Sequence, residues 1–179
     1  PAPSQGARSG RRVGRSAGRR CAGDLRAENV NFELTDDQKR IREAVRAFAE
    51  AEIAPRVAAW EKEEHFPREI LGRLGEMGVM GMMVPEAYGG AGADALSYVL
   101  AVEELARVCA STAVIVSVNN SVACYPIWKF GSEEQKTTVL KRLASGQALG
   151  AYALTEPQAG SDAANQKTRA VRDGSGYVL

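Results

Sequence analysis

The part of this sequence richest in groups that could do chemistry is the run Tyr-Ala-Leu-Thr-Glu-Pro-Gln-Ala-Gly-Ser-Asp, residues 152–162. It follows a predicted strand, contains a proline and a glycine at which the chain can turn, and carries hydroxyls at Thr155 and Ser161. Backbone N–H groups in a Gly/Ser turn can form a concave anion-binding site, to which Ser161 adds a donor. That geometry suits a pyrophosphate, and Thr155 could bond to a planar heterocycle. A simple β-turn with Asp162 capping its neighbours is the alternative interpretation.

A second glycine-containing run, residues 90–95, matches the pattern G-x-G-x-x-A of dinucleotide-binding loops. The mechanism of such a loop needs a strand that ends at the first glycine and an acid about 20 residues further on. Here Pro85 interrupts the strand, and no acid lies between Glu104 and Glu133. The sequence therefore argues against a Rossmann-type site.

The remaining candidate groups favour structural roles. His65, beside two glutamates, is predicted to be a surface residue in a charged loop. Glu103 and Glu104 are adjacent on a predicted helix and do not face each other, which predicts a solvated pair. The three cysteines lack CxxC spacing and the chain has one histidine, so neither a disulfide scaffold nor a metal site is expected. Core filling rather than an adaptable pocket is expected of the four methionines: Met77, Met80, Met82 and Met83.

Composition places the chain among soluble globular proteins. Of its 179 residues, 45% are apolar and 25% are charged, with 23 Lys+Arg against 22 Asp+Glu. Residues 1–23 hold six arginines and no acid, which leaves 17 basic and 22 acidic groups in the remainder. That acidic remainder makes nucleic acid an unexpected partner. Residues 108–130 are nearly uncharged but rich in small and polar side chains, so no membrane span is expected.

The two ends have distinct character. Residues 1–30 are predicted to form a disordered basic extension, because the first 23 have almost no large apolar side chains. Their composition fits either an organellar transit peptide or a non-native extension. A transit peptide would place the protein in the mitochondrial matrix, and a bacterial protein is expected in the cytoplasm. At the other end, residues 177–179 are typical of a strand beginning after a turn. A strand without a partner is marginal in water, so we expect a fragment that stops inside a β-region.

Between these ends the pattern predicts five helices. Capping boxes at residues 35–38 and 132–135 mark two helix starts, and Asp94 can cap a third. Apolar spacing predicts helices over residues 35–53, 67–77, 94–106, 113–125 and 133–146, limited by Pro55, Gly78, Pro126 and Gly146. Strands are predicted at residues 149–155 and 168–172. The predicted fold class is α+β, with an all-α helical bundle over residues 31–148 and the truncated start of a middle β-domain over residues 149–179.

Several of these stretches together resemble one enzyme family. Residues 153–162, Ala-Leu-Thr-Glu-Pro-Gln-Ala-Gly-Ser-Asp, resemble the first signature of the acyl-CoA dehydrogenases. Residues 34–38, 84–90 and 130–136 are similar to the family's opening helix, its first-domain loop and the segment before the last helix of that domain. The similarity covers residues 32–179 and looks closest to the short-chain, butyryl-like branch. Asn165 departs from it, because the signature usually has a small residue there.

The resemblance implies a three-part protein with a helical domain, a middle β-domain and a C-terminal four-helix domain. It implies oxidation of an acyl-CoA substrate to its trans-2-enoyl form with FAD as cofactor, in fatty-acid or amino-acid catabolism. A glutamate removes the α-proton and the β-hydrogen leaves as hydride to flavin N5. Electrons then pass to an electron-transferring flavoprotein, and the parent protein is expected to be a homotetramer or homodimer.

The resemblance also implies roles for individual residues. It implies FAD contacts by Tyr152, Leu154, Thr155, Gly160 and Ser161, with Thr155 at the pyrimidine edge of the flavin. Ser161 is expected near the pyrophosphates of both FAD and the CoA substrate, and so binds substrate as well. The family's acyl pocket lies partly along residues 116–123.

The catalytic glutamate of the family lies in the C-terminal domain, so no catalytic residue is assigned and the 179-residue chain is expected to be inactive. Glu156 is expected to hold the turn. Two alternatives remain: a stand-alone helical interaction module without catalysis, and an acyl-CoA oxidase-type flavoenzyme that uses another electron acceptor.

Overall fold

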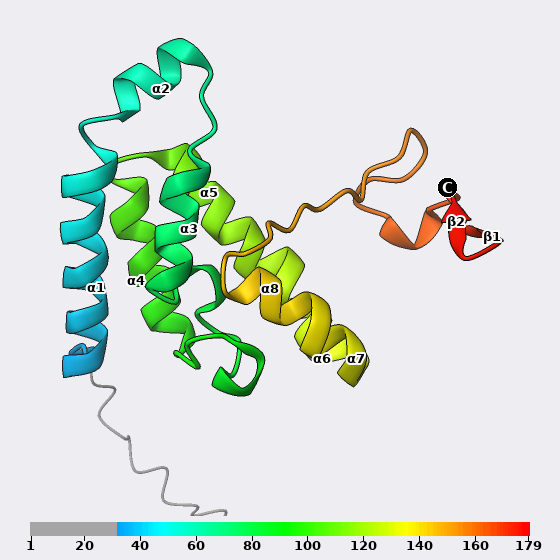
Figure 1. Ribbon diagram of the computed structural model, residues 1–179, viewed down its shortest axis with the longest axis horizontal. Coiled ribbons are helices and arrows are strands. Elements are labelled where there is room, and N and C mark those ends of the chain that lie inside the picture. The colour runs from blue at the N-terminus through cyan, green and yellow to red at the C-terminus, as the bar shows by residue number, and fades with distance from the viewer. Residues whose placement is uncertain (1–31) are drawn as a thin grey trace, which may run out of the picture. The chain divides into compact units, whose positions relative to one another are not determined.

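The computed structural model describes residues 32–179, so the predicted extension of residues 1–30 lies outside the described part. Residues 34–179 form one structural unit that is mainly helical, with one two-stranded antiparallel sheet near the C-terminus (Figure 1). The α+β class is confirmed. The α-helices are α1 (Asp36–Phe48), α2 (Val57–Glu63), α3 (Arg68–Glu76), α4 (Ala95–Ala106), α5 (Ala110–Val118), α6 (Tyr125–Phe130), α7 (Glu133–Gln135) and α8 (Lys141–Ala144).

Shorter or wider turns join several of these helices. Wide π-helical segments at Ala49–Ile53, Asn119–Cys124 and Lys136–Leu140 continue α1, α5 and α7. Single 3₁₀ turns lie at Val79–Gly81, Glu86–Tyr88 and Ala163–Asn165. Gly78 and Gly146 follow α3 and α8 with positive φ angles of 78° and 74°, which confirms both as the predicted helix stops.

Both predicted capping boxes are present. The Thr35 hydroxyl accepts from the Gln38 N–H at 3.2 Å, and the Gln38 side chain accepts from the Thr35 N–H at 3.0 Å. Ser132 and Gln135 repeat this exchange at the start of α7. Asp94 caps α4 by accepting from the Ser97 N–H at 2.7 Å. These three helix starts were predictable because each cap depends on residues three positions apart, whereas α2 was not predicted.

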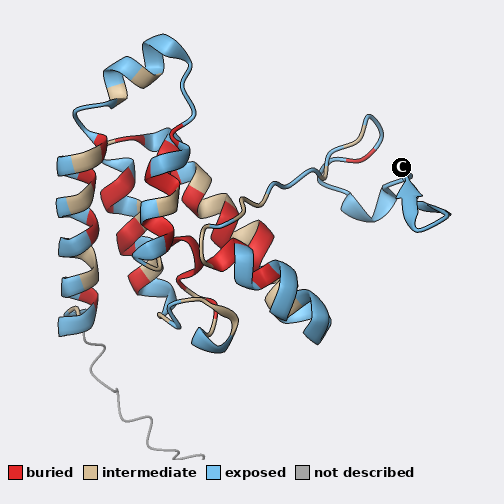
Figure 2. Ribbon diagram, in the orientation of Figure 1, coloured by how far each residue is buried: buried red, intermediate tan, exposed pale blue. Residues whose placement is uncertain are grey.

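The core forms two clusters of buried side chains. Figure 2 colours the buried residues red along the helices. The larger joins α1, α3, α4 and α5 through Val45, Ile53, Ile70, Leu71, Leu74, Met80, Met82, Leu105 and Val116, among others. The smaller joins Val84 to α8 and to two of the π-helical segments through Ala123, Cys124, Leu140, Leu143 and Ala144. Met80 and Met82 thus serve as core filling, whereas Met77 is 40% exposed.

The central helix differs from its prediction at both ends. It starts at Ala110, where the Cys109 side chain accepts from the Thr112 N–H, rather than at residue 113. It also passes Pro126 and ends at Phe130. The Tyr125 N–H bonds to the Asn120 carbonyl five residues back. This wider turn relieves the clash that a proline ring makes with the carbonyl four residues before it.

The strand predictions were only partly correct. Val171–Asp173 (β1) pairs antiparallel with Gly176–Val178 (β2), which confirms the turn and strand expected near the C-terminus. The expectation that this strand has no partner was wrong, because β1 pairs with it across the turn. Residues 149–155 form no strand in the structure. Their extended backbone has no neighbouring strand among residues 32–179, and a ladder needs two strands.

The prediction of a solvated Glu103–Glu104 pair was wrong for Glu104. Its carboxylate is 3% exposed and accepts from Arg46 of α1, Nη2 at 2.6 Å and Nε at 2.9 Å. Arg107 Nη1 adds a third bond at 2.6 Å. Glu103 is exposed, as expected. The pattern failed because α4 is apolar on most sides, and the helix turns Leu96 and Val99 outward instead.

We predict that Glu104→Gln lowers the free energy of unfolding by about 2 kcal/mol, because it breaks a paired buried charge while two half-exposed arginines keep access to water. Urea unfolding measures the loss. Glu103→Gln, one residue away and exposed, is the matched control and should change little. Equal effects of the two variants would contradict the cross-link between α1 and α4.

The same carboxylate should make stability depend on pH. Hydrogen bonds from Arg46 lower the pKa of Glu104 from 4.5 to about 2. Because the folded pKa lies below the unfolded one, the stabilisation is complete above about pH 4.5 and is lost as the pH falls toward 2. The difference in urea midpoint between the wild-type chain and Glu104→Gln should therefore shrink over that range. A constant difference down to pH 2 would argue against this assignment.

Candidate functional site: an apolar groove and a hydroxyl-lined bend

An apolar groove lies beside the middle of α5. Its lining comprises Phe66, Val114, Ile115, Val118, Leu149, Gly150, Ala151 and Tyr152, and its volume is about 360 Å³. Val114 is 59% exposed, an unusual degree for a valine in the middle of a buried helix. The lining contains no charged side chain. Such a surface can take an apolar chain but offers few groups to orient a polar one.

The segment that leads from this groove to the predicted site is fixed by Asn119, which is fully buried. Its Nδ2 donates to the carbonyls of Met80 at 2.8 Å and Leu143 at 3.1 Å, and its Oδ1 accepts from the Gly150 N–H at 2.9 Å. A Cβ atom on Gly150 would lie 2.2 Å from Cβ of Ala123, so only glycine fits against the helix. Sequence analysis assigned no role to Asn119. The sequence feature that could have indicated a buried polar role is the Asn-Asn pair inside an otherwise apolar helix.

Residues 152–162 form the bend that the sequence predicts. Glu156 and Ala159 exchange backbone hydrogen bonds of 2.8 and 3.1 Å across Pro157 and Gln158. The carboxylate of Glu156 accepts from other parts of the same loop, and hydrogen bonds from the Lys167 and Thr168 N–H groups hold its pKa below its ordinary value. The expectation that Glu156 holds the turn agrees with these contacts.

The predicted site residues divide between the two features. Tyr152 lines the groove and is 55% exposed, whereas Thr155, Gly160 and Ser161 are exposed on the bend and Leu154 is partly covered. Among residues 32–179, no protein group bonds to the hydroxyl of Thr155 or Ser161, or to the backbone N–H of Gly160 or Ser161. These donors are therefore available to a ligand. They fit a dinucleotide, because a pyrophosphate accepts from backbone N–H and hydroxyl donors.

The glycine run at residues 90–95 has the opposite character. The N–H groups of Gly90, Ala91, Gly92 and Ala93 all donate to carbonyls of residues 81–85. A Cβ on Gly90 would lie 2.1 Å from the Val84 carbonyl oxygen, so this glycine permits close packing. The backbone N–H groups of residues 90–93 are therefore not free to bind a phosphate.

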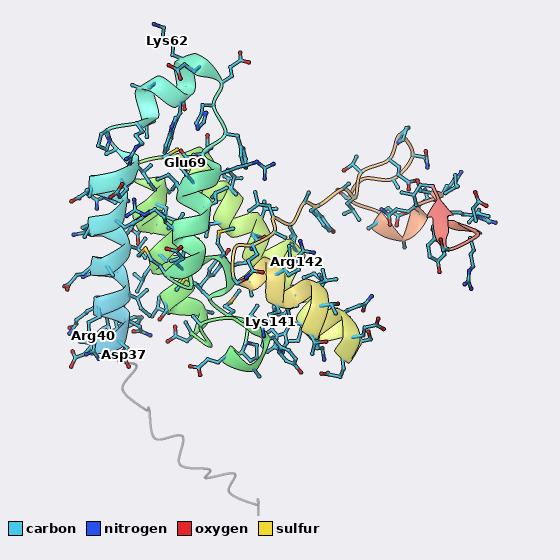
Figure 3. All side chains as sticks on the ribbon, in the orientation of Figure 1. Asp37, Arg40, Lys62, Glu69, Lys141 and Arg142 are labelled. Atoms are coloured by element: carbon cyan, nitrogen blue, oxygen red, sulfur yellow. The ribbon has the colours of Figure 1, made fainter. Side chains whose placement is uncertain are left out.

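His65 and Cys124 offer no catalytic geometry. His65 is exposed in the loop after α2, stacked on Trp60, with Nε2 3.5 Å from the carboxylate of Glu69. Figure 3 shows Lys62 directed outward from α2, the helix before this loop. Burial raises the pKa of Cys124 to about 12, so it stays a thiol. Within residues 32–179, no three His, Cys, Asp or Glu side chains gather as metal ligands, and no helix is long and apolar enough to cross a membrane.

Comparison with known proteins identifies the family. The family model for the acyl-CoA dehydrogenase N-terminal domain matches residues 35–147, from the start of α1 to the end of the helical region. The chain is 46% identical over 150 residues to the short-chain specific acyl-CoA dehydrogenase of Clostridium acetobutylicum, covering 84% of this chain and 40% of that protein. This chain belongs to the acyl-CoA dehydrogenase family.

Solved structures agree with this assignment. Butyryl-CoA dehydrogenase from Megasphaera elsdenii superposes with a TM-score of 0.75 at 40% identity, covering 82% of this chain and 39% of that one. A glutaryl-CoA dehydrogenase from Mycobacterium smegmatis, solved in complex with FADH2, gives 0.72 at 42% identity, covering 79% and 36%. The chain spans about 40% of the length of these curated relatives.

Removal of the Asn119 carboxamide should destabilise the helical unit. We predict that Asn119→Ala lowers the free energy of unfolding by about 3 kcal/mol, because two carbonyls and one N–H lose their buried partner. Ser121→Ala, on the same helix, removes a single bond to the Ser117 carbonyl and should cost less than about 1 kcal/mol. Urea unfolding compares the two variants. A smaller effect at Asn119 than at Ser121 would show that the network contributes little.

Proposed function

We propose that this chain is the N-terminal part of an FAD-dependent acyl-CoA dehydrogenase that converts an acyl-CoA thioester to its trans-2-enoyl form. The observation that carries the proposal is the set of uncommitted donors on the bend, with Tyr152 of the adjoining segment lining the apolar groove. Membership of the family supports it, as does the neighbour solved with FADH2.

The bend would contact both the isoalloxazine and the pyrophosphate of FAD. Thr155 would donate to the pyrimidine edge of the isoalloxazine, and Tyr152 and Leu154 would lie beside it. Ser161 and the N–H of Gly160 would bind the pyrophosphate, with Ser161 also near the pyrophosphate of the CoA substrate. Bound FAD would supply an acceptor, at N5, for the hydride that leaves the β-carbon.

The groove would receive the acyl chain. Its apolar lining suits a hydrocarbon, and the side chains of Val114, Ile115 and Val118 are small enough to leave space along α5. The relatives named for short-chain and butyryl substrates support a short acyl group. The substrate class proposed for the parent enzyme is therefore a short-chain acyl-CoA, used in fatty-acid or amino-acid catabolism.

The acid–base and electron-transfer steps need groups that the described residues do not supply. Glu156 is unsuitable as the base that removes the α-proton, because its carboxylate already accepts three hydrogen bonds within its own loop. We propose that the parent enzyme takes its base from the C-terminal domain of the family, passes electrons to an electron-transferring flavoprotein, and assembles as a homotetramer or homodimer.

Titration with cofactor fragments tests the two halves of the bend. In two-dimensional NMR spectra of the chain, FAD should shift the amide signals of both Thr155 and Ser161. Adenosine diphosphate, which lacks the isoalloxazine ring, should shift the amide signal of Ser161 more than that of Thr155. Riboflavin, which lacks phosphate, should shift the signal of Thr155 more. Ser161→Ala should abolish the response to adenosine diphosphate and leave that to riboflavin. Absence of any FAD-induced shift in the bend would refute this cofactor site and favour the interaction-module alternative.

Turnover is a separate test. The 179-residue chain with FAD and butyryl-CoA should reduce no dye, because a general base normally contributes about 10²–10⁴-fold and none is proposed within it. Dye reduction measured against a heat-denatured sample would detect activity. Turnover above that background would contradict the proposal that the base lies outside this chain.

A further inference from the structure

The bend belongs to a loop that closes on itself. Residues 154–158 and 165–168 are joined by side chain–backbone hydrogen bonds and by no apolar core, since most of these residues are exposed. A loop of this kind keeps its shape only while those bonds persist. The residues that make them therefore decide where its donors lie.

Glu156 makes two of these four bonds. Oε2 accepts from the Lys167 N–H at 2.8 Å and from Gln158 Nε2 at 2.5 Å, and Oε1 accepts from the Thr168 N–H at 3.1 Å. One carboxylate thus joins the first and last parts of the loop. Its negative charge is directed toward three donors of the loop itself, and charge-assisted bonds of this type are stronger than neutral ones.

Two amide side chains complete the closure. Gln166 Nε2 donates to the Leu154 carbonyl at 2.7 Å, and Asn165 Nδ2 donates to the Gln158 carbonyl at 3.3 Å. Asn165 is the position where the sequence departs from the small residue expected of the signature, and its longer side chain makes a contact that a small residue would not. The loop in this chain is therefore tied at three places.

The two hydroxyl residues lie between these fixed points. Thr155 stands between Leu154 and Glu156, both of which are bonded to residues 166–168. Ser161 stands between Ala159, which is buried and bonded to Glu156, and Asp162, whose carbonyl accepts from the Asn165 N–H. Fixing the neighbours on both sides restricts the backbone of each hydroxyl residue before any ligand arrives.

We propose that Glu156 is a positioning residue for dinucleotide binding: by clamping Lys167 and Thr168 it holds the donors of Thr155, Gly160 and Ser161 in their binding arrangement. This inference rests on the proposed function. Preorganisation of this kind raises affinity, because the loop need not be ordered when the ligand binds. Glu156 acts through the loop and contacts no reacting atom.

Glu156→Gln is the test, because an amide offers one acceptor oxygen where the carboxylate offers two. In NMR spectra of the full chain without ligand, the variant should shift the amide signals of Lys167 and Thr168 and speed their hydrogen exchange. Affinity for FAD, measured by titration, should fall by about tenfold or more. Glu63→Gln, an exposed glutamate on α2, is the matched control and should change neither measurement. The thermal midpoint of the helical unit should stay the same in both variants.

Ser161→Ala separates positioning from contact, since it should weaken FAD binding while leaving the Lys167 and Thr168 amides as they are. FAD affinity within twofold of wild type in Glu156→Gln would overturn the positioning role and leave the proposed function standing. Unchanged Lys167 and Thr168 amides in that variant would overturn the clamp itself. A wild-type chain that binds no FAD would overturn the proposed function, and the positioning role with it.

Discussion

The buried carboxamide of Asn119 connects three parts of the chain that are distant in sequence: the turn at Met80, the end of α8 at Leu143 and the segment that begins at Gly150. An amide suits this place because it donates twice and accepts once without carrying a charge. Apolar contacts pack the helices together, but they do not fix the path of the chain after α8. Asn119 fixes that path through its bond to the Gly150 N–H, and so sets the position of the residues that line one side of the groove.

Asn120 repeats this logic on the next residue. It accepts from the Met82 N–H and donates to the carbonyls of Val79 and Val116. Two adjacent amides thus bond to the backbone of the turn at residues 79–82. Both lie in the π-helical segment of the central helix. The irregular segment is therefore where the helix contributes polar groups to its surroundings, and apolar residues on either side of it serve the core and the groove.

Two carboxylates accept similar sets of hydrogen bonds but stabilise different parts of the structure. Glu104 lies in the helical unit and joins α1 to α4 through Arg46 and Arg107. Glu156 lies in an exposed loop and joins backbone N–H groups of residues 167 and 168. The first fixes the packing of helices, and the second fixes the shape of the loop. Both carboxylates accept three hydrogen bonds from groups of the protein itself, so neither is proposed as the catalytic base.

Local patterns in the sequence determined three capped helix starts, two glycine stops, the turn and strand near the C-terminus and the turn within residues 152–162, because each depends on residues a few positions apart. Tertiary structure alone decided which face of α4 is buried, the passage of the central helix through Pro126, the lack of a strand at residues 149–155 and the roles of Glu104 and Asn119. Arg46 lies 58 residues from Glu104, the partners of Asn119 lie 24 to 39 residues away, and residues 149–155 have no partner strand among residues 32–179. A single sequence records residue types but not which distant groups meet, and buried polar residues take their roles from those meetings.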